Sequence, residues 1–166
     1  MSEMITAKEI RHALKALIEK KAGLPYDVSF NRIEKSEKSY IWIELRHSKK
    51  SVDEAYFQRT IGVDINVILF PNDYATVIHD DLWDIADKLT VAVMPCVKIE
   101  TEDGNKSKNR YITVQDFSTY IVDDVLHYEF NLEFTDYVPS NKYEETEYEL
   151  MENLDIDLKE ETVAYG

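Results

Sequence analysis

The chain has 166 residues, 44% of them hydrophobic, and a formal net charge of −14 at pH 7. This length suits one domain with a modest appendage, and the hydrophobic fraction is enough for a core. So acidic a surface disfavours nucleic-acid binding through a basic patch, although it suits a passage through which DNA slides without binding. No apolar run is long enough to cross a bilayer, and the single Cys96 suits a reducing cytosol.

The charge divides the chain into two parts. Residues 139–166 contain nine Asp or Glu against two Lys, a net charge of −7, which leaves −7 for residues 1–138. We therefore expect a folded domain over residues 1–138. Residues 139–166 form an acidic C-terminal extension to it.

The first element is a helix with a clear start. Residues 6–9 read Thr-Ala-Lys-Glu, a capping box, and Ile5 and Ile10 stand at the positions of a hydrophobic staple. The helix is expected to run to about Lys21, because Gly23 then provides a stop signal. Its apolar face contains four residues at helical spacing: Ile10, Leu14, Leu17 and Ile18.

Two strands are expected next, over residues 26–32 and 40–46, and residues 47–53 are expected to form a loop. One face of the second strand is aliphatic, with Ile41, Ile43 and Leu45. Its other face carries Tyr40 and Trp42. Aromatic rings on this second face predict that Trp42 packs under a loop or against a neighbouring subunit.

Residues 60–93 predict one long strand, a corner and one long helix. Apolar residues alternate along the strand, which extends back to about Ala55: Ile61, Val63, Ile65, Val67 and Leu69. Pro71 ends the strand, and Asn72 or Asp73 is expected to cap the helix. The helix has one apolar stripe, formed by Ile78, Leu82, Ile85, Ala86, Leu89 and Val93.

The last part of the domain predicts three strands, over residues 96–101, 110–120 and 125–136. The middle strand is expected to contain a bulge near Asp116, and turns are expected at residues 102–105 and 123–124. In the last strand Tyr128, Phe130, Leu132 and Phe134 are expected to face inward, and His127, Glu129, Asn131 and Glu133 outward.

The predicted order is α-β-β-β-α-β-β-β. Short connections favour a mainly antiparallel sheet of five or six strands, with the two helices packed on one face. This is an α+β fold.

The acidic extension contains an alternating pattern, in which Leu154, Ile156 and Leu158 are separated by Asp155 and Asp157. A strand of this kind has nothing in its own segment to pair with. Three alternatives remain open: the segment is disordered, folds back on its own sheet, or adds to an edge of another chain.

No catalytic residue, cofactor site or metal site is predicted. Asp80, Asp84 and Asp87 share one helix face and could in principle hold a hard cation in a small metal-dependent hydrolase. They lie opposite the apolar stripe, however, so a solvated helix face is the favoured interpretation. His127, Glu129 and the neighbouring Glu133 are interpreted in the same way, as an outward polar row.

Four stretches of the chain carry a resemblance to a known family. They read MITAKEIR at 4–11, SYIWIEL at 39–45, YFQRTIGVDI at 56–65 and YEFNLEF at 128–134. Together, over roughly residues 4–137, they resemble the tail terminator (tail completion) proteins of tailed phages and of headless, contractile phage-tail-like bacteriocins.

The resemblance implies a non-enzymatic structural protein that forms a hexameric ring. Such a ring caps the tail tube, stops its polymerisation, and anchors the last sheath ring or the head connector. Its partners are other copies of itself, the tube protein, and the sheath protein or head connector, with no membrane and no specific nucleic acid, although DNA passes through the lumen. It assembles in the host cytoplasm and then belongs to the virion or tail-like particle. We expect subunit or partner contacts at Tyr40, Trp42, Leu154, Ile156 and Leu158.

Two other functions remain open. A head–tail joining protein of the same assembly would share most of these features. A host-directed protein that mimics nucleic acid with its acidic extension belongs to a different class.

Overall fold

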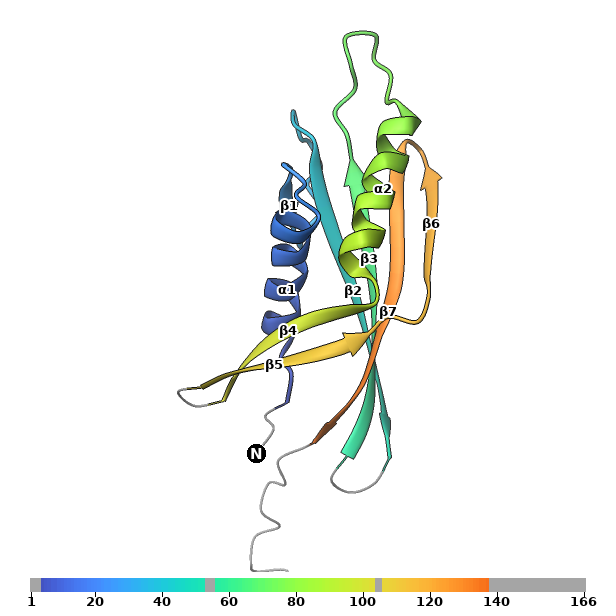
Figure 1. Ribbon diagram of the computed structural model, residues 1–166. Coiled ribbons are helices and arrows are strands. Elements are labelled where there is room, and N and C mark those ends of the chain that lie inside the picture. The colour runs from blue at the N-terminus through green and yellow to red at the C-terminus, as the bar shows by residue number, and fades with distance from the viewer. Residues whose placement is uncertain (1–3, 53–55, 104–105, 138–166) are drawn as a thin grey trace, which may run out of the picture.

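The computed structural model describes residues 4–52, 56–103 and 106–137 (Figure 1). Residues 139–166, including Leu154, Ile156 and Leu158, lie outside the described residues. The elements in chain order are α1 (Ala7–Ala16), a π-helical turn η1 (Leu17–Lys21), β1 (Asp27–Ser29), β2 (Tyr40–Ser51), β3 (Tyr56–Ile68), α2 (His79–Val93), β4 (Cys96–Asp103), β5 (Lys106–Thr113), β6 (Phe117–Val122) and β7 (Val125–Tyr137).

The described strands form two sheets. The larger sheet has the order β1-β2-β3-β7-β6, and β4 pairs with β5 in a separate ribbon. Every pair is antiparallel except β1 with β2. In Figure 1 both helices and the β4–β5 ribbon lie over one face of the larger sheet. The predicted α+β class, with two helices on one face of a mainly antiparallel sheet, is confirmed.

The core lies between this face and the helices. Ile61, Val63, Ile65 and Val67 of β3 point inward and are at most 2% exposed. Inward residues of β7 lie opposite them in the register. Ile65, for example, pairs with Ile43 of β2 on one side and with Tyr128 of β7 on the other. These residues pack against the buried stripe of α2: Leu82, Ile85, Ala86, Leu89, Ala92 and Val93. The alternation and the stripe therefore predicted most of the core correctly, but Ile78, predicted as part of the stripe, precedes α2 and is 49% exposed.

The start of the first helix is also confirmed. The hydroxyl of Thr6 accepts a hydrogen bond from the Glu9 amide at 3.2 Å, and the Glu9 carboxylate accepts one from the Thr6 amide at 2.6 Å. Ile5 and Ile10 are fully buried. The helical path continues through η1 to Lys21, and Gly23 follows with a φ of +64°. This left-handed conformation is the one that favours glycine after a helix.

The predicted cap of α2 is wrong. The helix begins at His79, and the side chain of Asn72 bonds to its own loop. Its Oδ1 accepts hydrogen bonds from the amides of Tyr74 and Thr76, both at 3.0 Å. Because these loop amides already occupy the Asn72 oxygen, it has no free acceptor for a helix, and Ile78 takes the N-cap position with half of its surface exposed.

β1 covers only Asp27–Ser29 of the strand predicted over residues 26–32. Two further strand boundaries differ from the prediction. Residues 47–51, predicted as loop, belong to β2, because pairing with β3 continues to Ser51 opposite Phe57. Residues 110–120 do not form one bulged strand. The amide of buried Val114 bonds to the carbonyl of Pro95 at 2.9 Å, and around this point the chain passes from β5, paired with β4, to β6, paired with β7. Burial and distant pairing decide both boundaries, and neither is visible in local pattern.

Candidate functional site

The face of the sheet opposite the helices is polar. Side chains from β2, β3 and β7 meet there in cross-strand rows: Trp42–Asn66–His127, Glu44–Asp64–Glu129 and Arg46–Gly62–Asn131. This confirms the outward direction predicted for the polar residues of β7. Neighbouring side chains in such rows lie within reach of one another, so this face can hold polar networks.

Asp64 is buried on this face, with 4% of its surface exposed. Its Oδ2 lies 3.1 Å from Nδ1 of His127 on β7, and its Oδ1 has no hydrogen-bond partner among the described residues. Burial raises the pKa of the Asp64 carboxyl, and the hydrogen bond with His127 opposes that rise only in part. This carboxyl therefore retains capacity for one more hydrogen bond.

Tyr120 of the edge strand β6 covers His127. Their rings stack with centroids 4.8 Å apart and planes 9° from parallel. The Tyr120 hydroxyl donates a 2.9 Å hydrogen bond to Oε1 of Glu129, which is the main cause of the raised pKa of Tyr120. Arg46 reaches the same oxygen at 3.5 Å. The network thus ties together β2, β6 and β7 and, through His127, β3.

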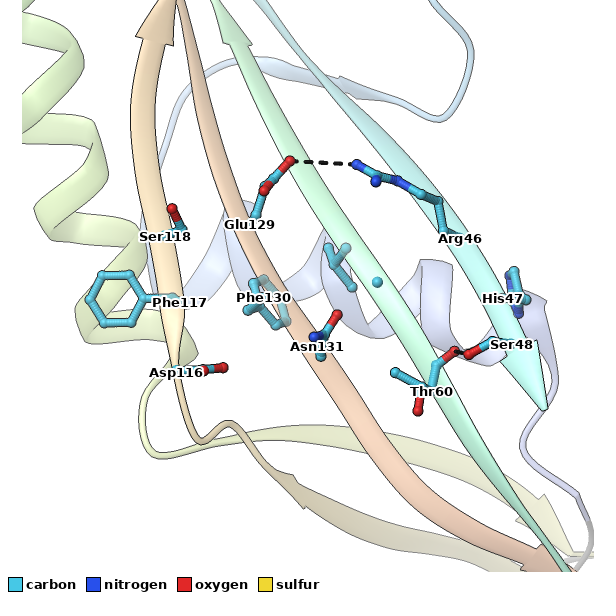
Figure 2. A pocket seen from close by; sticks show the side chains of 12 residues that line it. Arg46, His47, Ser48, Thr60, Asp116, Phe117, Ser118, Glu129, Phe130 and Asn131 are labelled. Atoms are coloured by element: carbon cyan, nitrogen blue, oxygen red, sulfur yellow. Dashed lines mark hydrogen bonds and ion pairs between the residues drawn. The ribbon is translucent and has the colours of Figure 1, made fainter. Parts of the chain in front are cut away.

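A hollow of about 410 Å³ lies beside Gly62 (Figure 2). Gly62 stands between Arg46 and Asn131 in its cross-strand row, so its missing side chain leaves space at the centre of the face. An added Cβ would lie 3.5 Å from Oδ1 of Asn131 and 3.6 Å from Cβ of Arg46, which is ordinary contact. The space beside Gly62 therefore accepts a methyl group without a clash.

The loop before β2 covers the two predicted contact rings. Tyr40 is 6% exposed, and its hydroxyl donates a 2.9 Å hydrogen bond to the carbonyl of Ile33. The guanidinium of Arg32 lies 6.0 Å from the centroid of the Trp42 ring. The loop is thus one of the two environments predicted for Trp42. A subunit contact through either ring remains a prediction.

Exposed apolar side chains gather around Trp42. A hollow of about 510 Å³ opens beside this ring, and its lining includes Phe70, which is 56% exposed, Val122, 50% exposed, and Ile33, 40% exposed. We call Ile33, Trp42, Phe70 and Val122 the Trp42 patch. Apolar side chains gathered beside a hollow are typical of a surface that binds another protein.

The edges of the large sheet are open over most of their length in the described part of the chain. β1 pairs only with Tyr40, Ile41 and Trp42, so the outer side of β2 has no partner strand beyond that point. β6 is paired only on its β7 side. An open edge presents backbone donors and acceptors to any strand that can reach it.

The inner face contains a buried ionic cluster that the sequence analysis missed. Arg59 is 4% exposed and Asp136 is 2% exposed. Arg59 donates to Oδ2 of Asp136 at 2.8 Å and also to the carbonyl of Ile5, and Arg110 donates to the other carboxylate oxygen at 2.6 Å. Both guanidiniums lie over the Phe134 ring, 5.1 and 5.5 Å from its centroid. The cluster joins the N-terminal segment to β3, β5 and β7.

A signal for this cluster was present in the sequence. Arg59 has the same parity as the inward residues Ile61 and Val63, and Asp136 has the same parity as Leu132. A charge on the inward side of an alternating strand requires a buried partner. Two such charges of opposite sign on strands that pair would have predicted the contact.

The three carboxylates considered for a metal lie on the exposed side of α2. Asp80, Asp84 and Asp87 are exposed, and among the described residues no group of three or more His, Cys, Asp or Glu is arranged to hold a metal ion. The adjacent His79 is instead paired with Asp124 in the β6–β7 turn, with 2.7 Å between Nε2 and Oδ1. This contact fixes the start of α2 to the turn.

None of the helices in the described chain combines the length and the apolarity that a membrane crossing requires.

Comparison with known proteins identifies the class. A family model described as phage tail terminator protein matches residues 8–159. The matched span is most of the chain, and the chain therefore belongs to the phage tail terminator family. It is a structural protein of a phage tail and a component of the virion. No curated protein matches the sequence at a significant level.

The match confirms the resemblance read from the sequence and extends it. The resemblance was predicted to end near residue 137, whereas the matched region continues to residue 159. It therefore includes Leu154, Ile156 and Leu158, so the alternating part of the acidic extension belongs to the region that the family model describes.

Proposed function

We propose that six copies of this protein form a ring that caps the tail tube, stops its polymerisation and anchors the last sheath ring or the head connector. The observation that carries the proposal is the open outer side of β2 together with the exposed Trp42 patch, in a chain of the tail terminator family. The number six comes from the resemblance. The two surfaces support association between copies.

The two surfaces differ in chemistry, which favours a head-to-tail contact. The Trp42 patch is apolar, and the outer side of β2 offers unpaired backbone and basic side chains such as Arg46 and Lys49. A contact between unlike surfaces repeats from copy to copy and gives a closed ring when the rotation closes. Ring closure would also cover edges that otherwise invite open-ended association.

The charge supports a role around a DNA passage. A protein with a net charge of −14 repels phosphate, so a ring made of it lets DNA move without retaining it. The proposed partners are other copies of the chain, the tube protein, and the sheath protein or head connector. Assembly takes place in the host cytoplasm.

Electron microscopy of tails made with and without this protein tests the proposal. We expect tubes of uncontrolled length in its absence and a ring at one tube end in its presence. Phe70→Glu combined with Val122→Glu should weaken the ring, because both charges enter the Trp42 patch. Tyr74→Glu is the matched control, since Tyr74 is 88% exposed and does not line the hollow beside Trp42.

The same experiment separates this proposal from a head–tail joining role. A terminator remains on the tube end when no capsid is present, whereas a joining protein is found there only with the capsid. Tubes of normal length without the protein would contradict a terminator.

A further inference from the structure

The outer side of β2 is an acceptor for a strand. Residues 43–50, which we call the free β2 edge, pair with β3 on one side and with no described strand on the other. Eight residues of strand extend about 26 Å. Every second residue of such an edge directs its backbone N–H and C=O away from the sheet, where another extended segment can bind.

The free β2 edge is basic in an acidic protein. The pKa of His47 is lowered, first by burial and then by the positive charges of Arg59, Arg11 and Lys49. Arg11 comes from α1, so the helix beside the edge adds to the same field. An acidic segment would be attracted here. The basic side chains of the edge itself are Arg46, His47, Lys49 and Lys50.

We infer that residues 153–159 of an adjacent copy add to this edge as an extra strand, an inference that rests on the proposed ring. Leu154, Ile156 and Leu158 alternate with Asp155 and Asp157, the pattern of a strand with one apolar and one acidic face. The faces of the free β2 edge correspond to these. Its inner face carries Ile43 and Leu45, and its outer face carries two basic residues, Arg46 and Lys50, against one acidic residue, Glu44.

The chain has the reach for this contact. β7 ends at Tyr137 opposite Tyr56, and β2 ends at Ser51 opposite Phe57, so the chain leaves the sheet two strand spacings from the β2 side. That distance is about 10 Å, whereas fifteen residues, 138–152, span up to about 50 Å. When extended, residues 138–152 span several times the distance to the β2 edge of their own subunit, so their length also allows contact with the β2 edge of another subunit that lies within about 50 Å.

The opposite edge of the sheet is a poor acceptor for this segment. Glu129 lies beside β6 in the next strand, and Asp123 and Asp124 form the exposed turn at its end. Asp116 precedes its first residue. Like charges in neighbouring strands repel, and β6 itself contains no basic residue, whereas the free β2 edge contains four. The acidic residues 155 and 157 therefore favour the β2 edge.

Amide hydrogen exchange of the full chain, assembled on tubes, tests the inference. Ile156→Pro removes a backbone N–H from the middle of residues 153–159 and disfavours a paired strand there. We expect the outward-directed amides of residues 43–50, which do not pair with β3, to exchange at least ten times faster in this variant than in the natural chain, with β6 unchanged. Thr162→Pro, outside the segment, is the matched control and should leave exchange unaltered. Equal exchange in Ile156→Pro and the natural chain would overturn the inference, as would a change confined to β6.

Disulfide trapping identifies which copy supplies the strand. All chains carry Cys96→Ser, and chains with Ser48→Cys are mixed with chains with Asp157→Cys. We expect a covalent dimer from the mixture and its loss when Lys49→Glu and Lys50→Glu are added. A link formed only within single chains that carry both cysteines would refute the adjacent copy as donor.

The two proposals fail in distinguishable ways. If Ile156→Pro leaves exchange at β2 unchanged while tubes keep their normal length, only the strand addition is wrong. If tubes have normal length without any of this protein, the capping function is wrong whatever the exchange data show.

Discussion

Two buried carboxylates of this protein, Asp136 and Asp64, lie on opposite faces of the same sheet and differ in the hydrogen-bond partners of their oxygens. Asp136 faces the core, and each of its oxygens accepts a hydrogen bond from a different arginine. Asp64 lies on the polar face, where one oxygen contacts His127 and the other has no described partner. Both residues are less than 5% exposed.

The difference separates a fully paired structural charge from a buried carboxyl whose hydrogen bonding is incomplete. A buried charge with both oxygens paired holds its strands together and offers nothing to a partner. The carboxyl of Asp64 has one oxygen without a described partner, so its hydrogen bonding is incomplete although it is buried. Charge pairing is therefore complete at Asp136 on the inner face and incomplete at Asp64 on the polar face.

The largest effect is expected from removing the charge of Asp136. Asp136→Asn should lower the free energy of unfolding by about 3–5 kcal/mol, because the buried Arg59 is left without its counter-ion. Urea unfolding followed by circular dichroism measures this.

A double variant sharpens the same point. Arg59→Met combined with Asp136→Leu should be much less destabilised than Asp136→Asn, since no buried charge remains unpaired. Equal destabilisation of the two variants would mean that shape, rather than charge pairing, governs this end of the sheet.

Asp64→Asn should have a smaller effect that depends on pH. Burial raises the folded-state pKa of Asp64, so folding favours its protonated form. Burying the charged carboxylate lowers the free energy of unfolding. This loss of stability is absent below the unfolded-state pKa of Asp64, and it is fully present once the pH exceeds the raised folded-state pKa. Asp64→Asn should therefore be more stable than the natural chain by about 1 kcal/mol at neutral pH. This advantage should disappear as the pH falls below the ordinary range of an aspartate.

Urea titrations from pH 3 to pH 8 measure the Asp64 effect, with Glu133→Gln as an exposed control on the same face. If the extra stability of Asp64→Asn over the natural chain increased toward low pH, burial would not be the cause of the raised pKa of Asp64.

Tyr120→Phe removes the hydroxyl that bonds to Glu129 and keeps the ring that stacks on His127. We expect a loss of about 0.5 kcal/mol, since the bond is solvent-accessible. Thermal unfolding of Tyr120→Phe is compared with that of Tyr120→Ala, which also removes the stacked ring. The difference between the two variants separates the contribution of the stacking from that of the hydrogen bond. A loss in Tyr120→Phe as large as in Tyr120→Ala would show that stacking contributes nothing.

The smallest effect is expected at the exposed pair His79–Asp124. His79→Ala should change the free energy of unfolding by less than about 0.5 kcal/mol, because exposed pairs are screened by water and salt. The Asp124→Ala variant provides the second corner of a double-mutant cycle. A coupling above 1 kcal/mol would mean that this contact fixes α2 more firmly than its exposure suggests.

Features that depend on neighbours in the chain were predictable from the sequence. The capping box of Thr6 and Glu9 forms within four residues, and the turn at Asp123 and Asp124 adopts the positive φ angles of 50° and 61° that a tight turn needs. Alternation along β3 and β7 identified the buried faces, because side chains of a strand alternate whatever it pairs with.

Features that depend on distant partners were decided only by the tertiary structure. Nothing near residues 110–120 indicates that β5 pairs with β4 while β6 pairs with β7, and nothing near residue 47 indicates that β3 extends β2 to Ser51. The burial of Asp64, the pairing of Asp136 with two arginines, and the open side of β2 have the same origin. Backbone pairing and charge neutralisation require groups far apart in sequence to meet, and local pattern does not record which groups those are.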